Sequence, residues 1–423
     1  MEFFGHHLCP DFPTVPSNLS DAATYDGTII IIGAGVAGLT AAASLLRMGL
    51  PKEKVVIFEA SDCVGGRLKA TPPNSFLESV GIDGPPLDLG AEWIHSVKGA
   101  KVLESIMQDL VGEDRKRVVP ELISYTPDLH LNGKKSRVLS WIYKETKFLN
   151  TTWYHWLVSN LYNQVQDCVA LNSPVSKVKY SNGSEKNDAG ESGELVAITL
   201  KDGTVHTADR LICTAPLAVL KERMIEFDPP LPKRMNIAID AIDMAPGVRV
   251  LMQMKEKFYK DVNYCGSALN FVKNGDDLAI IYDPLLGKGL HQKDAHVCAF
   301  VAIGNKNAGD LCKLSDDELA KAVLARIDKA YDGQGSKNLV GAPIVQNWRA
   351  EPYIRGAYTF SDVSSKLGKD LGKPIGKSAV FFAGEHTSIT HPSLVPGAAC
   401  EGRKAALEVV SSLNLGGGAN KSS

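Results

Sequence analysis

Four consecutive isoleucines, residues 29–32, run directly into a turn with three glycines, and this junction limits the possible folds more than any other feature of the chain. Gly33, Gly35 and Gly38 have the spacing GxGxxG, and an alanine-rich stretch follows to about Met48. This order predicts a buried parallel strand that turns into a helix. The first glycine permits the tight turn, the second lets the backbone approach a pyrophosphate, and the third lets the helix pack close to the strand.

A second apolar run and an acidic residue complete the predicted unit. Residues 55–58 end at Glu59, which lies 21 residues after Gly38. A carboxylate at the end of the second strand can accept hydrogen bonds from both hydroxyls of a ribose, which favours a dinucleotide without a 2′-phosphate. The stretch from residue 28 to 48 also has the length of a membrane span, but its internal glycines favour the βαβ interpretation.

Composition excludes several other classes of protein. The 423 residues are 44% hydrophobic and 22% charged, which is typical of a globular chain of two or three domains. The net charge of −2 offers no field that would hold nucleic acid. Eight cysteines without a CxxC pair predict neither a disulfide framework nor a metal site. Because the first 27 residues contain no Lys or Arg, we expect no secretory signal or transit peptide, and a cytoplasmic location.

Later segments predict further elements of a mixed fold. The expected strands cover residues 175–180, 195–200, 204–208, 211–214 and 380–383, and a Lys201-Asp202-Gly203 turn joins the second and third of them. Residues 315–318 read as a capping box, and Leu319, Val323 and Ile327 then recur at helical spacing. A last helix is expected from residue 398 to about 413. This order predicts an antiparallel meander that returns to the parallel sheet.

The string after Glu59 carries a resemblance to a known family. It reads E-A-x-x-x-V-G-G-R and ends at Arg67, and at this distance from GxGxxG it resembles the flavin-dependent amine oxidase family, with polyamine oxidases as the nearest members. Four more segments extend the resemblance to about residue 410: GAEWIH at 90–95, LNSPV at 171–175, NW to GAY at 347–358, and FAGEHTS with VPGA at 382–398. A guanidinium on a glycine turn is also a good second clamp for a diphosphate.

The resemblance implies an α/β fold with two domains. One is an FAD-binding domain of the Rossmann-like, glutathione-reductase type, and the other is a substrate domain of a mixed sheet plus helices. The expected FAD-binding domain comprises residues 28–95, 160–226 and 365–415, and the substrate domain residues 96–159 and 227–364. Residues 1–27 and 416–423 are expected to be tails.

By resemblance, the cofactor contacts surround FAD from end to end. They are Gly33, Gly35, Gly38, Glu59, Arg67, Gly90, Ala91, Glu92, Trp93, Val175, Trp348, Gly384, Glu385, Leu394 and Val395. Glu385 is expected toward the ribityl chain, and the backbone N–H of Val395 near the flavin pyrimidine, where negative charge develops on reduction.

The sequence departs from the family pattern in four places. Ala357 stands where monoamine oxidases have a cysteine tethered to the flavin, so non-covalent FAD is expected. Leu394 stands opposite Tyr358, which leaves one aromatic wall of the substrate cage. Arg249 replaces a lysine that reaches flavin N5 through a water, and arginine keeps the charge but cannot deprotonate. Only 79 residues separate His95 from Val175, so the substrate domain is expected to be trimmed.

The expected reaction is the oxidation of a polyamine-like amine. A hydride from the carbon next to nitrogen would pass to flavin N5, and water would hydrolyse the imine to an aldehyde and an amine. Tyr358 would align the nitrogen, His95 would tune its protonation or bind a second nitrogen, and Arg249 would act beside N5. Glu92 and Glu351 are candidates for attracting a cationic substrate. O2, reduced to H2O2, or another acceptor would take the electrons.

Other functions fit the same residues. An L-amino-acid oxidase would use Arg249 or Arg355 as a bidentate clamp for a carboxylate. Other flavin oxidoreductases, such as desaturases, share the nucleotide signature. The substitution at Arg249 and the trimmed segment are also compatible with a flavin-binding scaffold of weakened activity. We expect a monomer or homodimer that acts on a small amine, without nucleic acid, membrane or metal.

Overall fold

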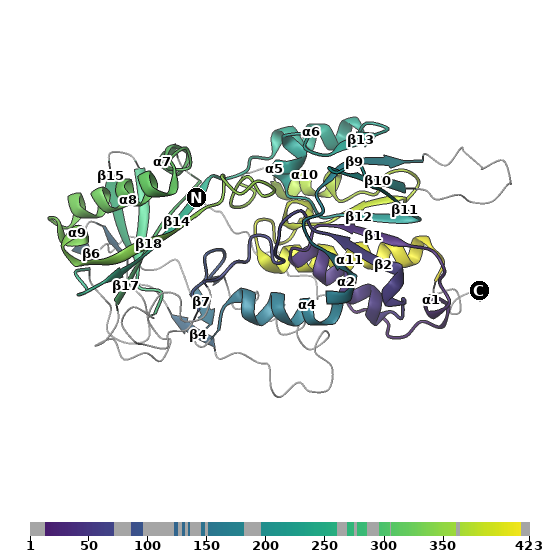
Figure 1. Ribbon diagram of the computed structural model, residues 1–423, viewed down its shortest axis with the longest axis horizontal. Helices are drawn as coiled ribbons and strands as arrows, with labels where there is room; N and C mark the ends of the chain where they lie inside the picture. The colour runs from purple at the N-terminus through teal and green to yellow at the C-terminus, as the bar shows by residue number, and fades with distance from the viewer. Residues whose placement is uncertain are drawn as a thin grey trace.

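The fold is that of a computed structural model, which describes residues 13–71, 86–95, 122–125, 129–131, 134–135, 145–148, 151–181, 196–259, 269–274, 277–285, 296–304, 306–360 and 364–415. The molecule is elongated, with two lobes side by side (Figure 1). One lobe is built on a parallel sheet and carries both described ends of the chain. The other is built on a larger mixed sheet.

The first lobe is centred on a five-stranded parallel sheet with the order β19-β12-β1-β2-β8. The strands are β1 (Ile29–Ile32), β2 (Val55–Phe58), β8 (Val169–Ala170), β12 (Arg210–Cys213) and β19 (Val380–Phe382). Strand β1 pairs in parallel with β12 on one side and β2 on the other. Since the strands are short and buried on both faces, they read as continuous apolar runs rather than alternating ones.

The two faces of this sheet pack into separate cores. Ile29 and Ile31 of β1 point into a core shared with the helices α2 (Val36–Arg47), α4 (Ser159–Val165) and α11 (Val395–Ser412). Ile30 and Ile32 point into the opposite core, under a four-stranded sheet. The alternation of side chains along a strand therefore places every second isoleucine in each layer. Figure 1 shows α2, α4 and α11 on one side of the sheet and β9 to β11 on the other.

The covering sheet has the order β11-β10-β9-β13. Its strands are β9 (Val175–Tyr180), β10 (Val196–Leu200), β11 (Val205–Ala208) and β13 (Glu226–Asp228). Three helices adjoin this layer: α5 (Leu217–Lys221), α6 (Lys233–Ala241) and α10 (Ser364–Leu371). Short elements complete the lobe: α1 (Ser20–Ala23) and the single turns Lys52–Lys54, Tyr154–Val158, Gln166–Cys168 and Glu385–Thr387.

The second lobe is a seven-stranded sheet with the order β18-β14-β17-β16-β15-β5-β6. Its strands are β5 (Leu129–Leu131), β6 (Lys134–Lys135), β14 (Gly247–Met254), β15 (Leu269–Asn274), β16 (Asp277–Tyr282), β17 (His296–Ile303) and β18 (Leu339–Asn347). The helices are α7 (Lys306–Leu311), α8 (Asp316–Ala330) and α9 (Gln334–Asn338). A separate small sheet joins β3 (Ile94–His95), β7 (Glu145–Phe148) and β4 (Leu122–Tyr125).

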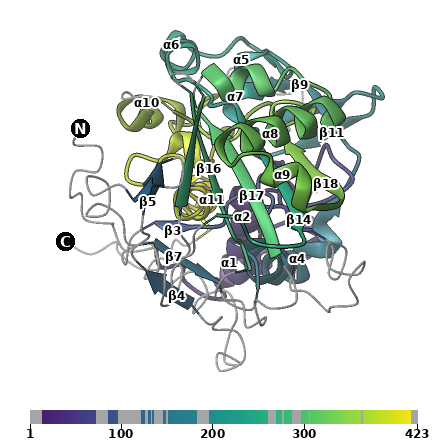
Figure 2. The ribbon, with the colours of Figure 1, turned by 90° about the vertical axis from the view of Figure 1, so that its left-hand side faces the viewer.

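The side chains of β14 alternate between two environments, and this alternation positions the site. Val248, Val250 and Met252 pack into the core under α8, which lies across the sheet in Figure 2. The intervening residues Arg249 and Leu251 therefore project from the opposite face of the sheet. That face carries a smaller apolar core around Leu251.

The predicted α/β fold with a Rossmann-like half and a mixed-sheet half is confirmed, and so is the meander that returns to the parallel sheet. The capping box of Ser315 and Glu318 is present, and Leu319, Val323 and Ile327 are buried as expected. The last helix begins at Val395 rather than at 398. No helix within the described ranges is long and apolar enough to span a membrane.

The boundaries between the two lobes differ from the domain boundaries that we expected from the sequence. Helix α6 lies beyond the expected change of domain after residue 226, yet its buried residues Met235 and Ile239 join the core under the parallel sheet. Trp153 and Trp156, expected in the substrate domain, pack into the core of α2 and α11. The periodicity of an amphipathic helix shows that one face is buried but not which sheet it packs against. The lobe to which α6 belongs is therefore known only from the packing.

Candidate active site

An elongated cavity of about 410 Å³ runs from the carboxyl ends of the parallel strands to the second sheet. Its walls come from both lobes. Ile32, Gly33 and Glu59 lie at the parallel sheet, and Ile280, Val301 and Ile303 lie on the second sheet. The size is typical of a pocket for a small molecule or cofactor, and the place is where α/β sheets bind ligands.

The glycine turn has the geometry that its spacing predicts. Gly33 has a φ of +96°, which side chains rarely allow. Gly38 packs so closely that a Cβ atom there would lie 1.9 Å from the carbonyl oxygen of Gly33, whereas a Cβ at Gly35 would meet no atom within 4 Å. Gly38 therefore brings helix α2 close to β1, and Gly35 leaves open space in the cavity wall.

A second glycine turn lies directly beside the first. Gly65 donates its backbone N–H to the carbonyl of Ala34 at 2.9 Å, and Gly35 and Gly65 form a parallel bridge. A Cβ at Gly66 would lie 3.5 Å from the Cα of Gly35. Both turns line the cavity, so two glycine-rich backbones form one concave surface next to the start of α2.

Glu59 lies in the cavity wall at the end of β2, as predicted. Its carboxylate accepts hydrogen bonds from the backbone N–H groups of Ala34 at 2.6 Å and Ser61 at 2.8 Å. The two bonds engage different oxygens and leave further lone pairs on each. Glu59 thus fixes the glycine turn and keeps acceptors for a ligand.

Arg67 and Glu385 form an ion pair in the cavity wall. Nη1 of Arg67 donates to Oε1 of Glu385 at 2.6 Å and to the carbonyl of Ala357 at 3.1 Å. The other oxygen of Glu385 accepts from Thr359 and from the N–H of Ser393. Burial alone would raise the pKa of Glu385, but the guanidinium and the hydroxyl outweigh it and hold this pKa below its usual value.

The expected aromatic residues belong to the wall of the same cavity. Tyr358 and Trp348 both line it, and burial raises the pKa of the Tyr358 hydroxyl, which stays neutral. Backbone bonds hold their positions: Ala245 donates to the carbonyl of Tyr358 at 2.8 Å, and Trp348 donates to that of Gly247 at 3.0 Å. Leu394 and Val395, at the start of α11, line the same cavity and direct the helix N-terminus toward it.

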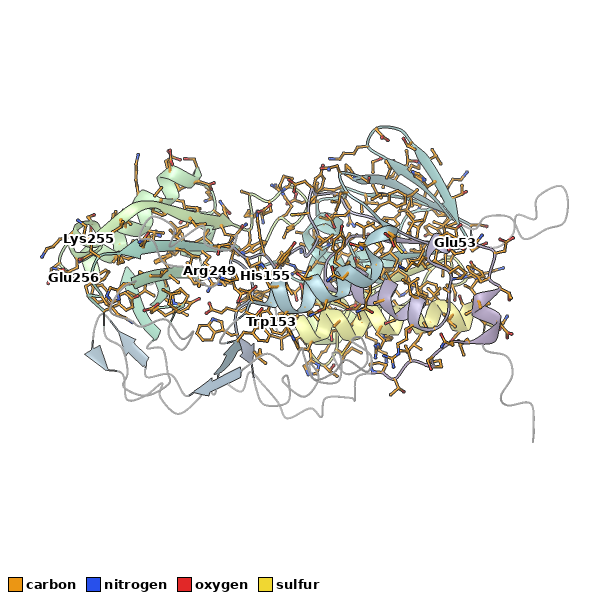
Figure 3. The ribbon with its side chains drawn as sticks, turned by 60° about the horizontal axis from the view of Figure 1, so that its bottom comes forward. Glu53, Trp153, His155, Arg249, Lys255 and Glu256 are labelled. Atoms are coloured by element: carbon orange, nitrogen blue, oxygen red, sulfur yellow. The ribbon has the colours of Figure 1, made fainter. Side chains whose placement is uncertain are left out.

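Arg249 enters the cavity wall from β14 and is paired with Glu92. Nη2 of Arg249 and the hydroxyl of Tyr282 both donate to Oε2 of Glu92, and Nη1 of Arg249 donates to the carbonyl of Gly90 at 2.9 Å. Arg249 and Glu92 are 4% and 3% exposed, so this is a buried ion pair. Figure 3 places Arg249 at the end of its strand that faces the other lobe, away from Lys255 and Glu256.

The structure brings most of the predicted site residues together. The cavity is lined by Gly33, Gly35, Glu59, Arg67, Gly90, Ala91, Glu92, Trp93, Val175, Arg249, Trp348, Tyr358, Gly384, Glu385, Leu394 and Val395. Gly38 does not line it and acts by close packing instead. His95 lies in β3, where its backbone pairs with Glu145, and its side chain is outside the described residues.

Three predicted charges have partners that the sequence did not indicate. Glu92 is bound to Arg249, so its charge is balanced and the expectation that it attracts a cationic substrate is not supported. Glu351 contacts Lys69 at 3.0 Å and Gln346 at 2.7 Å, and it is not part of the cavity wall. Arg355 pairs with Glu222 at 3.0 Å and is likewise absent from this wall.

Several cavity residues were missed by sequence reasoning. Thr214 closes the glycine turn by donating to the carbonyl of Ile32 at 2.7 Å. Lys201, in the predicted hairpin turn, places its Nζ 5.0 Å from the ring centre of Tyr353, and both residues line the cavity. Ile280 and Val301 supply part of the apolar wall. The sequence predicted the turn that contains Lys201. It could not predict that Lys201 contacts Tyr353, because this contact depends on the tertiary fold.

Comparisons with known proteins agree with this geometry. Residues 152–410 match the family described as flavin containing amine oxidoreductase, and residues 31–110 match an NAD(P)-binding Rossmann-like domain. Since the first match covers more than half of the chain, the protein belongs to the flavin-containing amine oxidoreductase family. It is therefore an enzyme of the FAD-dependent amine oxidoreductase class, and a flavin is its cofactor.

Particular relatives point in the same direction. Probable polyamine oxidase 4 of Arabidopsis thaliana is 23% identical over 460 residues, covering 88% of this chain and 84% of that protein. Lysine-specific histone demethylase 2 of Homo sapiens is also 23% identical, and the match spans about half of its length, 53%. A solved structure of a putrescine oxidase mutant with redesigned cofactor binding has a TM-score of 0.66 at 16% identity and covers 91% of this chain and 99% of that one.

The residues present fit a flavin with an adenosine diphosphate extension. The cavity is elongated, two glycine turns form a cradle that a Cβ at Gly35 would invade, and the acid Glu59 lies at the ribose end. Toward the second sheet, Arg249 supplies a cation to the cavity wall, and Trp348 and Tyr358 supply two aromatic rings that suit a flavin ring. Both ends of the cavity therefore suit the cofactor that the family carries.

Proposed function

We propose that this enzyme oxidises a polyamine-like amine with non-covalently bound FAD and O2. The bound FAD would supply the two-electron oxidation of the carbon next to the nitrogen, and O2 would accept these electrons and be released as H2O2. The substrate becomes an imine, which water hydrolyses to an aldehyde and an amine. The proposal is supported by relatives named polyamine oxidases and by the chemistry of the cavity wall.

One observation carries the preference for an amine without a carboxylate. The arginines that line the cavity within the described ranges are Arg67 and Arg249, and both already hold a buried glutamate, Glu385 and Glu92 respectively. A guanidinium that already pairs with a buried glutamate binds a substrate carboxylate more weakly than an unpaired guanidinium would. The arrangement therefore favours an amine over an L-amino acid.

The remaining wall suits an amine that reacts in its neutral form. Ile280, Val301 and Ile303 give the side of the cavity toward the second sheet an apolar wall, which favours a neutral amine over a charged one. Tyr358 presents an aromatic ring whose hydroxyl stays neutral, so it can orient the nitrogen by its face. We expect the N–H groups at the start of α11, near Val395, to stabilise negative charge on the reduced cofactor.

Anaerobic mixing with candidate substrates tests the proposal directly. Purified enzyme is mixed with spermine, spermidine, their acetylated forms, putrescine, simple amines and L-amino acids, and the visible absorbance of oxidised flavin is followed. At least one di- or polyamine is expected to bleach the flavin, with peroxide appearing after air is admitted. Bleaching by L-amino acids alone, with a KM that rises sharply in Arg249→Met, would favour the amino-acid oxidase. No bleaching by any of them would support a weakened scaffold.

Acid precipitation tests the non-covalent attachment. Because Ala357 occupies the position of the tethering cysteine in the family resemblance, trichloroacetic acid is expected to leave a white pellet and a yellow supernatant containing intact FAD. Ala357 lines the cavity, so Ala357→Cys serves as the matched variant. Flavin that stays with the wild-type pellet after denaturation would contradict the prediction.

Lys201 and Tyr353 are expected to hold the adenosine end of the cofactor. The Lys201 ammonium lies over the Tyr353 ring and lines the cavity, so we expect it to contact adenosine as well, and an exposed cation–π contact of that kind contributes about 0.5–1 kcal/mol. Lys201→Ala should therefore raise the dissociation constant of FAD by about two- to fivefold. FMN lacks adenosine, so its affinity for the apoprotein should not change. Equal losses for FAD and FMN, measured by flavin fluorescence, would show that the lysine acts elsewhere.

A further inference from the structure

The buried cluster of Arg249, Glu92 and Tyr282 is built from three segments that are distant in sequence. Arg249 lies in β14 and Tyr282 lies in β16. Glu92 lies in the irregular segment directly before β3. The ring of Tyr282 also lies under the guanidinium carbon at 5.6 Å and against Trp93 at 5.2 Å between ring centres. Arg249, Glu92 and Trp93 line the cavity, while Tyr282 stands behind them.

The hydrogen bonds define the charge of the cluster. Two donors, the guanidinium and the phenol hydroxyl, converge on the same oxygen of Glu92, which must therefore act as an acceptor. Arginine keeps its proton in proteins, so the pair consists of a fixed cation and a carboxylate. The hydroxyl dipole of Tyr282 partly offsets the negative charge of Glu92 and leaves the positive charge of Arg249 less fully balanced.

The side chain of Arg249 forms part of the cavity wall, although it is only 4% exposed. Nη1 and Nη2 donate to Gly90 and Glu92, and the buried Nε–H has no acceptor among the described residues. Arg249 shares this part of the cavity with Trp348, Tyr358 and Val395. Under the proposed function, this is the end that receives the isoalloxazine ring, whose reduction adds negative charge.

We propose that Glu92 is a positioning residue that sets both the orientation and the effective charge of Arg249, and that this pair, adjusted by Tyr282, tunes the reduction potential of the bound flavin. The inference rests on the proposed function in so far as it needs FAD in the cavity. It does not depend on which amine is oxidised.

The signs of the expected effects follow from electrostatics in a site of low dielectric constant. Positive charge beside the ring favours the reduced, more negative cofactor and raises its potential, whereas negative charge lowers it. Glu92→Gln leaves the Arg249 charge unbalanced and should shift the potential upward. Arg249→Met should shift it downward. The double variant removes both charges and should return close to the wild-type potential.

The experiment is a reductive titration of each FAD-loaded variant with dithionite against a reference dye, without amine. Tyr282→Phe gives an independent test in a protein that keeps the ion pair. It removes the dipole that offsets the carboxylate, so the potential should move downward, opposite to Glu92→Gln and by less. Glu92→Asp should restore the wild-type value in part. An unchanged potential in both Glu92→Gln and Tyr282→Phe would overturn the inference.

Asp283→Asn is the matched control. Asp283 pairs with Lys257 at 3.0 Å, with side chains that are 2% and 12% exposed, in the same lobe but outside the cavity wall. Breaking this pair should affect stability without moving the potential. A shift as large as that of Glu92→Gln would mean that loss of any buried ion pair loosens the lobe, and would reject a specific role for Glu92.

The outcomes separate this inference from the proposed function. A flavin that dithionite reduces with the expected order of potentials, but that no amine bleaches, supports the role of Glu92 and rejects the proposed substrate. A flavin that amines bleach, with potentials that do not respond to Glu92 or Tyr282, supports the substrate and rejects the inference. A protein that binds no flavin rejects both.

Discussion

Replacing Arg67 with methionine is expected to yield a protein that is purified almost colourless. The guanidinium lines the cavity next to the second glycine turn, where we expect the diphosphate of FAD, and charge-assisted hydrogen bonds of this kind contribute about 1.5–3 kcal/mol. The dissociation constant of FAD should therefore rise by up to about 100-fold, as measured by titration of the apoprotein. Arg67→Lys keeps the charge and should lose much less.

The same substitution has a second effect, on stability. It leaves the carboxylate of Glu385 buried without its cation, which costs about 3–5 kcal/mol. Arg67 holds the pKa of Glu385 down, so in Arg67→Met this pKa should rise and the lone charge should be neutralised as pH falls. The gap in Tm between variant and wild type should be widest at neutral pH and should narrow in acid. A gap that widens in acid would contradict this account.

A surface arginine gives the control for these two effects. Arg223 pairs with Asp240 at 3.2 Å, and their side chains are 49% and 67% exposed. Such exposed pairs contribute little, so Arg223→Met should leave FAD affinity and Tm almost unchanged. Equal loss of flavin in both variants would mean that general destabilisation, and not the clamp, releases the cofactor.

Two alanine substitutions in the first glycine turn are expected to have different effects. Gly38→Ala should impair folding, whereas Gly35→Ala should impair FAD binding. At Gly38, the added Cβ would lie 1.9 Å from the Gly33 carbonyl oxygen, so helix α2 must move away from β1. Overpacking of this kind costs about 3 kcal/mol, and Gly38→Ala should lower Tm markedly or leave insoluble protein. At Gly35, the Cβ would meet no atom within 4 Å and φ is −75°, which alanine adopts readily.

Gly35→Ala should therefore fold with a Tm near that of the wild type, yet bind FAD poorly, because its methyl group enters the space that the pyrophosphate would approach. Thermal unfolding of the apoproteins and titration with FAD separate the two variants. Gly309→Ala, in α7 with an ordinary contact of 3.9 Å to Pro246, is the control and should be neutral or slightly stabilising. Normal FAD affinity in a folded Gly35→Ala would argue against the cradle.

Local patterns predicted the nucleotide half of the molecule with little error. The isoleucine strand, the three glycines and Glu59 form one continuous stretch, and their roles depend on neighbours within about 30 residues. The capping box at Ser315 and the hairpin turn at Lys201 were equally readable, since a cap and a turn are decided by a few adjacent residues.

The ion pairs and hydrogen bonds between charged side chains could not be predicted from local patterns. Arg249 and Glu92 are 157 positions apart, Tyr282 and Glu92 are 190 apart, and Arg67 and Glu385 are 318 apart. The sequence identified Arg67, Arg249 and Glu92 as site residues, but it assigned Glu92 to the substrate or the cofactor. It could not show that Glu92 and Arg249 would form an ion pair with each other.

Strand period, turn glycines and motif spacing act over short distances along the chain, so they were enough to predict a dinucleotide-binding βαβ unit and a family with flavin chemistry. The pairing of charges in the cavity wall, the lobe that α6 joins and the contact of Lys201 with Tyr353 became known only from the folded molecule. These depend on contacts between segments that meet when two sheets pack, and no local pattern encodes the partner of a buried side chain.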